Sequence, residues 1–367
     1  MIIDVVIGTR PEAIKMAPVI TELRRREHFS VRTISTGQHA EMCRQALDFF
    51  GLSPDVDLSI MKQAQSLDYI TSSVLNGIGK LLDRDRPDAV LVHGDTTTSF
   101  AASLAAFYRE IPIGHVEAGL RSFNMKRPFP EEMNRVMTDR IAHWLFAPTE
   151  LAAKNLRAED ERTGERIHVT GNTVIDALHA ALEILRASGS RNSGINMGHA
   201  PFILMTAHRR ESWGKPMENI CRALLEILRR HEGYGALVPM HKNPAVRDTI
   251  RDILGGHENV TLCDPLDYPD FVQVLDGCKI ILSDSGGVQE EASALGKPVV
   301  VLRDVTERPE ATEAGTAVLA GAEYGRIVAI TDRLLSDDTE YSRLSERKSA
   351  NPFGDGKASA RIADILS

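Results

Sequence analysis

The chain has 367 residues, of which 43% are hydrophobic and 26% are charged, and its formal net charge is −8. This length predicts about two domains, because domains average roughly 150 residues. The negative charge argues against a general nucleic-acid binder, which needs clustered Lys and Arg. No apolar stretch approaches the ~20 residues of a membrane span, and the first residues lack the basic flank of a signal peptide. We therefore expect a cytoplasmic protein with no membrane or nucleic-acid partner.

The cysteines are scattered and form no Cys-x-x-Cys pair, which disfavours a zinc site and a disulfide framework. They are Cys43, Cys221, Cys263 and Cys278, and we expect them to be buried thiols. No G-x-G-x-x-G follows the first predicted strand, and no G-x-x-x-x-G-K-[ST] occurs anywhere. The sequence therefore lacks the motifs that predict a dinucleotide site or a P-loop. We expect neither a metal nor a cofactor.

Short apolar runs typical of strands alternate with helical patterns along the whole chain. This alternation predicts an α/β fold, in which helices wrap parallel sheets. One series of strands ends near residue 170 and a second begins at Phe202, which predicts two doubly wound halves. A segment rich in Gly, Ser and Asn at 187–198 predicts an exposed loop. The main runs lie at 2–7, 31–35, 89–92, 202–205, 236–238, 280–283 and 299–302.

The first predicted strand leads directly into a helix start. Thr9 and Glu12 have capping-box spacing, and Pro11 suits a first helical turn. A helix N-terminus attracts anions, and Arg10 and Lys15 can reinforce it against a diphosphate. From this motif alone, an ordinary capped helix with solvated cations stays open as the alternative.

Acidic side chains gather in the motifs between residues 93 and 132. Asp95 and Glu117 each follow a short apolar run, so we expect them at the carboxyl ends of strands, where open α/β sheets build their sites. Glu131 follows a proline at the start of a predicted helix. Asp95 can instead cap the next helix and Glu131 can complement a helix dipole, whereas no helix period requires Glu117. Together the motifs indicate proton chemistry.

Two histidines follow predicted strands of the second half. His208 stands beside Arg209 at the end of its strand, and His241 repeats that placement after the next strand. A pocket histidine titrates near neutral pH and can donate to a phosphate or sugar oxygen. His208 has the stronger claim to chemistry, although a lone histidine is more often structural.

The strongest binding signal is a strand that ends in a Gly-Gly turn before a helix. The turn consists of the small residues Ser285, Gly286 and Gly287. Small residues let the backbone N–H groups at the helix start approach an anion closely. Glu291 lies further along that helix, where it can accept hydrogen bonds from ribose hydroxyls. Arg308 follows the next strand and can neutralise the same diphosphate.

Eight ordered motifs of this chain resemble those of the non-hydrolysing UDP-N-acetylglucosamine 2-epimerases, and the match runs from residue 7 to about residue 357. The motifs are Gly8-Thr9-Arg10-Pro11-Glu12, Thr36-Gly37-Gln38-His39, His93-Gly94-Asp95-Thr96, His115-Val116-Glu117-Ala118-Gly119-Leu120-Arg121, Pro130-Glu131-Glu132-Met133-Asn134-Arg135, His208-Arg209-Arg210-Glu211, Asp284-Ser285-Gly286-Gly287 and Glu307-Arg308-Pro309-Glu310.

This resemblance implies two Rossmann-like domains of the glycosyltransferase-B type with an interdomain cleft. It also implies a homodimer and a last helix that returns to the first domain. The expected bounds are 1–169 for the domain with the acidic residues, 170–352 for the UDP-binding domain and 353–367 for the last helix.

The same resemblance implies roles for individual residues. Those that match catalytic positions of the family are Asp95, Glu117, Glu131 and His208. Those that match contacts to the UDP moiety are Arg10, Lys15, Phe271, Ser285, Gly286, Gly287, Glu291 and Arg308. Some bacterial members bind a second UDP-sugar as an activator, and Gln38, Arg209 and His241 match residues of that site.

The implied reaction is the reversible interconversion of UDP-N-acetylglucosamine and UDP-N-acetylmannosamine, without NAD or an essential metal. UDP leaves C1, the C2 proton is removed to give 2-acetamidoglucal, and UDP adds back with the proton on the opposite face. Carboxylates stabilise the oxocarbenium-like charge, and carboxylates in unlike environments can serve as acid and base. The alternatives are a 2-epimerase of a modified sugar such as a UDP-diacetamido uronate, a hydrolysing epimerase, and a glycosyltransferase-B-type transferase.

Overall fold

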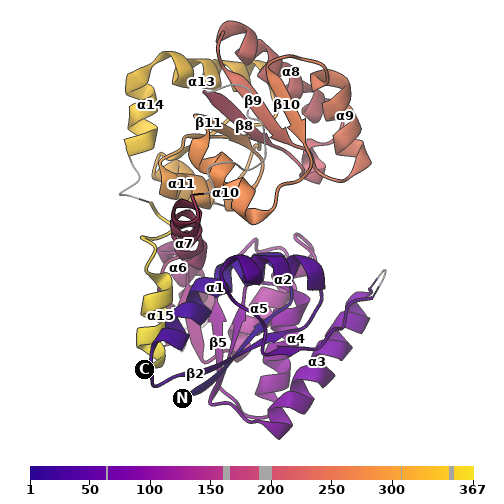
Figure 1. The fold of residues 1–367 in the computed structure, drawn as a ribbon, viewed down its shortest axis with the longest axis vertical. Coiled ribbons are helices and arrows are strands. Elements are labelled where there is room, and N and C mark those ends of the chain that lie inside the picture. Colours follow the sequence, from indigo (N-terminus) through magenta and orange to yellow (C-terminus); the bar gives the residue numbers. More distant parts are fainter. Residues whose placement is uncertain (63–64, 160–165, 190–200, 307, 347–350) are drawn as a thin grey trace. The chain divides into compact units, whose positions relative to one another are not determined.

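The computed structural model describes residues 1–367 except 63–64, 160–165, 190–200, 307 and 347–350. The chain divides into two compact units, Met1–Ala180 with Phe353–Ser367 and Ala181–Pro352 (Figure 1). The sequence places the boundary near residue 170, before α7 (Thr173–Ala187), whereas this division falls within that helix. Most of the loop predicted at 187–198 lies outside the described residues.

The first unit contains a parallel sheet of seven strands in the order β3-β2-β1-β4-β5-β6-β7. The central strand β1 pairs with β2 on one side and with β4 on the other. The direction of winding reverses between β1 and β4, and in such sheets ligands bind at the carboxyl ends of the strands near this point. The strands are β1 (Ile2–Ile7), β2 (Ser30–Ser35), β3 (Val56–Asp57), β4 (Ala89–His93), β5 (Ile113–Val116), β6 (Trp144–Ala147) and β7 (Ile167–Val169).

Helices cover the first sheet because its strands are buried apolar runs. Val6, Val90 and Val92 share one core cluster with side chains of α3 and α4. Other helix contacts join α1 to α2 and α1 to α15, and Figure 1 shows both chain ends beside α1 and α15. The helices are α1 (Arg10–Arg25), α2 (Ala40–Phe49), α3 (Leu67–Arg84), α4 (Thr97–Phe107), α5 (Glu131–Ile141), α6 (Glu150–Glu159) and α15 (Ala358–Leu366).

The second unit repeats this winding in a six-stranded parallel sheet of order β10-β9-β8-β11-β12-β13, which reverses between β8 and β11. Its core cluster joins the strands to α8, α9 and α13. The strands are β8 (Phe202–Thr206), β9 (Gly235–Pro239), β10 (Val260–Cys263), β11 (Ile280–Ser283), β12 (Val299–Val301) and β13 (Ala317–Leu319). The helices are η2 (Arg210–Ser212), α8 (Lys215–Arg230), α9 (Pro244–Leu254), α10 (Tyr268–Gly277), α11 (Gly286–Leu295), α12 (Pro309–Glu313), α13 (Tyr324–Ser336) and α14 (Asp338–Ser345).

The predicted α/β class with two Rossmann-like, doubly wound halves is confirmed by these sheet orders. The last helix packs in the first unit, where the carboxylate of Asp176 accepts hydrogen bonds from the backbone N–H groups of Ala358 at 3.2 Å and Ser359 at 2.8 Å. Asp176 thereby caps the N-terminus of α15, although it lies in α7. In the described part of the chain, no helix is long and apolar enough to span a membrane.

Candidate active site

The turn between β1 and α1 is fixed by Glu12. Its carboxylate accepts hydrogen bonds from the N–H groups of Gly8 at 3.1 Å and Thr9 at 2.7 Å, the second of which belongs to the predicted capping box. It also accepts from the hydroxyl groups of Thr96 at 2.8 Å and Ser99 at 2.9 Å, at the start of α4. Glu12 is buried, so it ties the turn after β1 to the turn after β4.

Glu117 follows β5 and adopts the left-handed backbone conformation, with φ of +68°. Its carboxylate pairs with the ammonium of Lys15, and Nε2 of His93 lies 3.4 Å from Oε2 of Glu117. The exposed fraction of the side chain is 10% for Glu117, 14% for Lys15 and 5% for His93. A positive charge beside a carboxylate favours its ionised form. The sequence gave His93 no role and matched Lys15 to a UDP contact; in the structure both side chains lie beside Glu117.

Asp95 follows β4, but it is not the cap of α4. The cap is Thr96, whose hydroxyl accepts a hydrogen bond from the N–H group of Ser99 at 3.0 Å. The Asp95 carboxylate accepts instead from the guanidinium of Arg135 at 2.5 Å, and Asn134 donates to the Asp95 carbonyl at 2.9 Å. Capping therefore does not explain Asp95, which is held by α5.

The two neighbouring glutamates at the start of α5 have different surroundings. Glu132 is buried and accepts hydrogen bonds from the N–H groups of Ser122 at 3.0 Å and Phe123 at 2.9 Å, so it anchors the preceding loop. Glu131 begins the helix, and its Oε2 atom is buried with no hydrogen-bond partner among the described residues. A buried oxygen of this kind is costly unless a ligand satisfies it.

In the second unit, Asp284 holds the turn that carries His208. Its Oδ2 atom accepts hydrogen bonds from the N–H groups of His208 and Arg209, each at 2.9 Å, and from the hydroxyl of Ser212 at 3.1 Å. Nδ1 of His208 lies 3.2 Å from Oδ1 of Asp284. Sequence reasoning gave Asp284 no separate role, although it stands directly after β11.

Replacing Asp284 by asparagine tests the electrostatics of this turn. Burial by itself would raise the pKa of Asp284, but His208 and the backbone N–H groups outweigh it and lower the pKa below its ordinary value of 3.8. The ionised carboxylate thus stabilises the folded state at pH values above 3.8. This contribution is lost as the pH falls through the lowered pKa that Asp284 has in the folded protein. We expect Asp284→Asn to lower the free energy of unfolding at pH 7 by roughly 1–3 kcal/mol. The difference from wild type, measured by urea unfolding, should shrink in acid; a constant difference contradicts the prediction.

The residues matched to an activator site belong to different units. His241 is exposed and its ring stacks on that of His208, with centroids 5.8 Å apart and 21° between the planes. Arg209 adjoins His208 in the same turn. Gln38 belongs to the first unit, where it accepts a hydrogen bond from the hydroxyl of Thr98 at 2.8 Å. The second unit therefore groups Arg209 and His241 with the predicted catalytic His208.

The Gly-Gly turn after β11 forms the N-terminus of α11, with Ser285 as the residue before the helix. A Cβ atom built on Gly287 would meet no heavy atom within 4 Å, and one on Gly286 would lie 4.0 Å from the side chain of Arg308. Packing among the described residues therefore does not demand glycine here. The small side chains leave the backbone N–H groups of a helix N-terminus accessible, as anion binding requires.

Arg308 lies beside this helix start. The guanidinium of Arg308 pairs with the carboxylate of Glu290. The backbone N–H group of Arg308 donates to the hydroxyl of Thr306 at 3.0 Å. That hydroxyl in turn donates to Oε1 of Gln289 at 2.9 Å, so residues of α11 fix the loop that carries Arg308. Sequence reasoning missed Glu290 and named its neighbour Glu291.

The remaining predicted UDP contacts are spread over both units. Glu291 is buried within α11, and Phe271 is half-buried in the first turn of α10. Arg10 is the half-buried first residue of α1. Among the described residues, no group of three or more His, Cys, Asp or Glu side chains is arranged to hold a metal ion.

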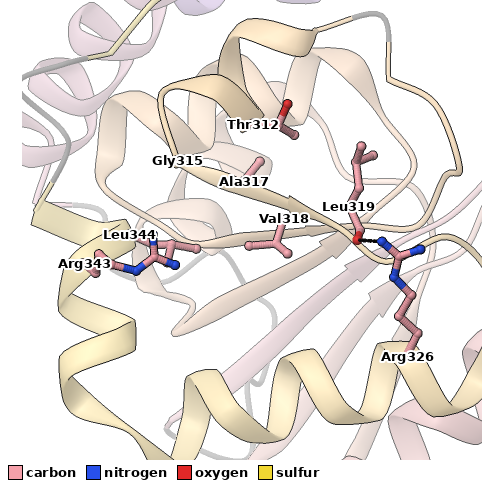
Figure 2. Close-up of a pocket in the computed structure, with 8 residues that line it drawn as sticks. All are labelled: Thr312, Gly315, Ala317, Val318, Leu319, Arg326, Arg343 and Leu344. Carbon is pink, nitrogen blue, oxygen red and sulfur yellow. Dashed lines mark hydrogen bonds between the residues drawn. The ribbon is translucent and has the colours of Figure 1, made fainter.

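A pocket of about 360 Å³ lies elsewhere in the second unit, beside the edge strand β13. Figure 2 shows its apolar wall from β13 and the guanidinium of Arg326, which donates to the carbonyl of Leu319 at 2.9 Å. It is lined by Thr312, Gly315, Ala317, Val318, Leu319, Arg326, Arg343 and Leu344. None of the predicted site residues lines this pocket, so it is separate from the candidate site.

Comparison with known proteins decides the family. A family model described as UDP-N-acetylglucosamine 2-epimerase matches residues 21–367. The UDP-N-acetylglucosamine 2-epimerase of Salmonella typhimurium is 48% identical over 367 residues, covering 98% of this chain and 97% of that protein. The chain belongs to the UDP-N-acetylglucosamine 2-epimerase family.

Solved structures of this family share its fold. The UDP-GlcNAc 2-epimerase of Neisseria meningitidis, crystallised with bound UDP-GlcNAc, superposes with a TM-score of 0.90 and 46% identity over 100% of this chain and 99% of that chain. The enzyme of Methanocaldococcus jannaschii, in complex with UDP-GlcNAc and UDP, gives a TM-score of 0.82 at 34% identity, with 100% and 99% coverage. The architecture is therefore the glycosyltransferase-B type with two Rossmann-like domains.

Proposed function

We propose that this chain is a non-hydrolysing epimerase that interconverts UDP-N-acetylglucosamine and UDP-N-acetylmannosamine. The observation that carries the proposal is the set of carboxylates in the first unit, each in a different setting. Glu117 pairs with Lys15, and Asp95 pairs with Arg135. The buried Oε2 atom of Glu131 has no partner among the described residues. Carboxylates in unlike environments hold different protonation states, as a reaction with one acid and one base requires.

The chemistry follows from these settings. The C2–H of the sugar is not adjacent to a carbonyl, so its proton becomes removable only as UDP leaves and positive charge develops at C1. Glu117, ionised beside Lys15, suits the base that takes this proton, which gives 2-acetamidoglucal and UDP. Glu131 is assigned as the acid, because its buried Oε2 atom has no hydrogen-bond partner among the described residues. Asp95 then stabilises the charge on the ring.

We assign the binding of UDP mainly to the second unit. The N-terminus of α11, at Ser285, Gly286 and Gly287, offers backbone N–H groups to the diphosphate, and Arg308 adds a positive charge. The similarity to the Neisseria protein that was crystallised with UDP-GlcNAc supports this ligand. His208, oriented by Asp284, supplies a further donor to the diphosphate.

The remaining UDP contacts are assigned by chemistry and by family resemblance. Glu291 suits the ribose hydroxyls, Phe271 suits the uracil ring, and Arg10 and Lys15 add positive charge from α1. The proposal includes no NAD and no essential metal. It also includes a cytoplasmic location and a homodimer.

Product analysis tests the proposal. The chain is incubated with UDP-N-acetylglucosamine alone, and the products are separated by anion-exchange chromatography. A non-hydrolysing epimerase leaves a mixture of two UDP-sugars and no free sugar. Free N-acetylmannosamine with UDP would indicate a hydrolysing enzyme, and an unchanged substrate would contradict both forms of epimerase.

Gly287→Ala separates the binding role of the helix start from its structural role. Beyond its chain neighbours and its own helix backbone, a methyl group at this position meets no atom of the described residues within 4 Å, so the free energy of unfolding should stay unchanged or rise slightly. The same methyl group should block the approach of a diphosphate and weaken UDP binding at least about tenfold, or ~1.4 kcal/mol, by calorimetry.

The matched control for this variant is Gly325→Ala. Gly325 is the second residue of α13, as Gly287 is of α11, and it has no assigned ligand. This control should bind UDP like wild type. Unchanged UDP affinity in Gly287→Ala would contradict the assignment of the diphosphate to α11.

A further inference from the structure

Glu117 needs support from its surroundings because it adopts a backbone conformation that residues with a Cβ atom avoid. Its φ of +68° lies in the left-handed region, which costs roughly 1–2 kcal/mol for an ordinary residue. Such residues persist where the surrounding structure over-determines them, and they cluster at functional sites. Residues that precede and follow Glu117 in the chain supply this support through hydrogen bonds.

A buried histidine, His115, stands two residues before Glu117, on β5. Its Nδ1 atom lies 2.6 Å from Oδ1 of Asp139, and its Nε2 atom lies 2.7 Å from the carbonyl oxygen of Gly94. His115 thus links the side chain of Asp139 to the backbone of Gly94, and it has no exposed surface.

Asp139 also pairs with an arginine. Burial alone would raise the pKa of Asp139, but His115 and Arg121 lower it, so the carboxylate is ionised. Arg121 lies 2.7 Å from Asp139 and 2.5 Å from Glu159, so one guanidinium joins two carboxylates. Ion pairs this deeply buried are rarely the most stable choice for a core, so another reason for keeping them is expected.

The network holds the backbone at two points near the proposed catalytic carboxylates, and Asn155 holds a third. Gly94, whose carbonyl accepts from His115, directly precedes Asp95. Gly119, two residues after Glu117, donates its N–H group to Oδ2 of Asp139 at 3.3 Å. The carbonyl of Gly119 accepts from the side chain of Asn155 at 3.0 Å. Glu117 is thus bracketed on both sides, and the turn of Asp95 is tied to the same network.

We propose that His115 and Asp139 are positioning residues for the epimerisation, which hold Glu117 in its left-handed conformation and fix the turn that carries Asp95. This inference rests on the proposed function, because it assigns the chemistry to Glu117 and Asp95. The pair acts through the backbone and has no contact with substrate in this assignment.

Asp139→Asn tests the positioning role. We expect kcat to fall about tenfold to hundredfold, since small misplacements of catalytic groups cost this much. KM and the Kd for UDP should change little, because the UDP contacts are assigned mainly to the second unit. A lower kcat with unchanged UDP affinity separates loss of positioning from a general structural defect, which would weaken UDP binding as well.

The matched control is Asp83→Asn, which removes the same charge from a surface pair with Arg109 where Asp83 is 63% exposed, and which should leave kcat unchanged. If Asp139→Asn does not fold, Asn155→Ala decides, because it removes only the hydrogen bond to the Gly119 carbonyl and should lower kcat several-fold. Wild-type kcat in a folded Asp139→Asn, or in Asn155→Ala, overturns the inference. A wild-type protein that converts no UDP-N-acetylglucosamine refutes the proposed function instead.

Discussion

Replacing Glu117 by glutamine should abolish conversion of UDP-N-acetylglucosamine, with a loss of roughly a thousandfold or more in kcat. The amide keeps the shape of the side chain but cannot take the C2 proton, and it no longer pairs with the ammonium of Lys15. UDP affinity, measured by calorimetry, should stay within about a factor of three of wild type because the diphosphate is assigned mainly to α11 and Arg308. Activity is measured as the rate of UDP-N-acetylmannosamine formation.

Glu110→Gln is the matched control for this variant. Glu110 also has a left-handed backbone, with φ of +54°, but its side chain is exposed and follows α4 away from the predicted site residues. This control should retain wild-type activity. If Glu117→Gln instead lost its UDP affinity or failed to fold while Glu110→Gln was normal, Glu117 would be a structural residue.

Replacing Arg308 by methionine should have two separable effects. The Arg308 side chain is 13% exposed and its partner Glu290 is 2% exposed, so the substitution leaves a buried carboxylate without its cation. Breaking a buried pair in this way costs about 3–5 kcal/mol of unfolding free energy. UDP affinity should fall as well, because the proposed positive charge at the diphosphate is lost.

The double variant Arg308→Met with Glu290→Gln distinguishes the two effects. Neutralising Glu290 should restore much of the stability, measured by urea unfolding, while UDP binding remains weak. Arg230→Met is the control, because Arg230 pairs with Glu226 on the surface at 42% exposure and should change stability by less than about 1 kcal/mol. Full recovery of UDP affinity in the double variant would show that Arg308 acts only as the partner of Glu290.

The strand-to-helix junctions that carry the candidate site were predictable from sequence because their signals are local. The runs at 2–7 and 280–283 are apolar and end at glycine or serine, and the structure places β1 and β11 at those bounds. Once a parallel sheet is inferred, the residues that follow its strands must gather at one edge. Asp95, Glu117 and His208 were found in this way.

Short or partly polar strands escaped prediction for the opposite reason. β3 has only two residues, Val56 and Asp57, and it is a strand because β2 pairs with it. β10 is half-buried along its whole length, so its sequence lacks a continuous apolar run. In such segments the tertiary structure, and not the local sequence, selects the strand.

The pairings within the site could not be read from the sequence. Lys15 and Glu117 meet across 102 residues of chain, and the two ends come together only when α1 and β5 take their places on the sheet. His115 and Asp139 meet because α5 packs on the unit in one particular register. The N-cap of α4 could not be predicted from the sequence either. Asp95 and Thr96 both suit that position, and only the backbone geometry selects Thr96.

The exchange of hydrogen at C2 is the most direct test of the central claim. The protein is incubated with UDP-N-acetylglucosamine in D2O, and the C2 position of the sugar is followed by NMR. Removal and return of the C2 proton predict deuterium at C2 in both UDP-sugars, with UDP still attached at equilibrium. UDP-sugars that retain protium at C2 after prolonged incubation with folded protein would contradict the assignment of proton transfer to Glu117 and its neighbouring carboxylates.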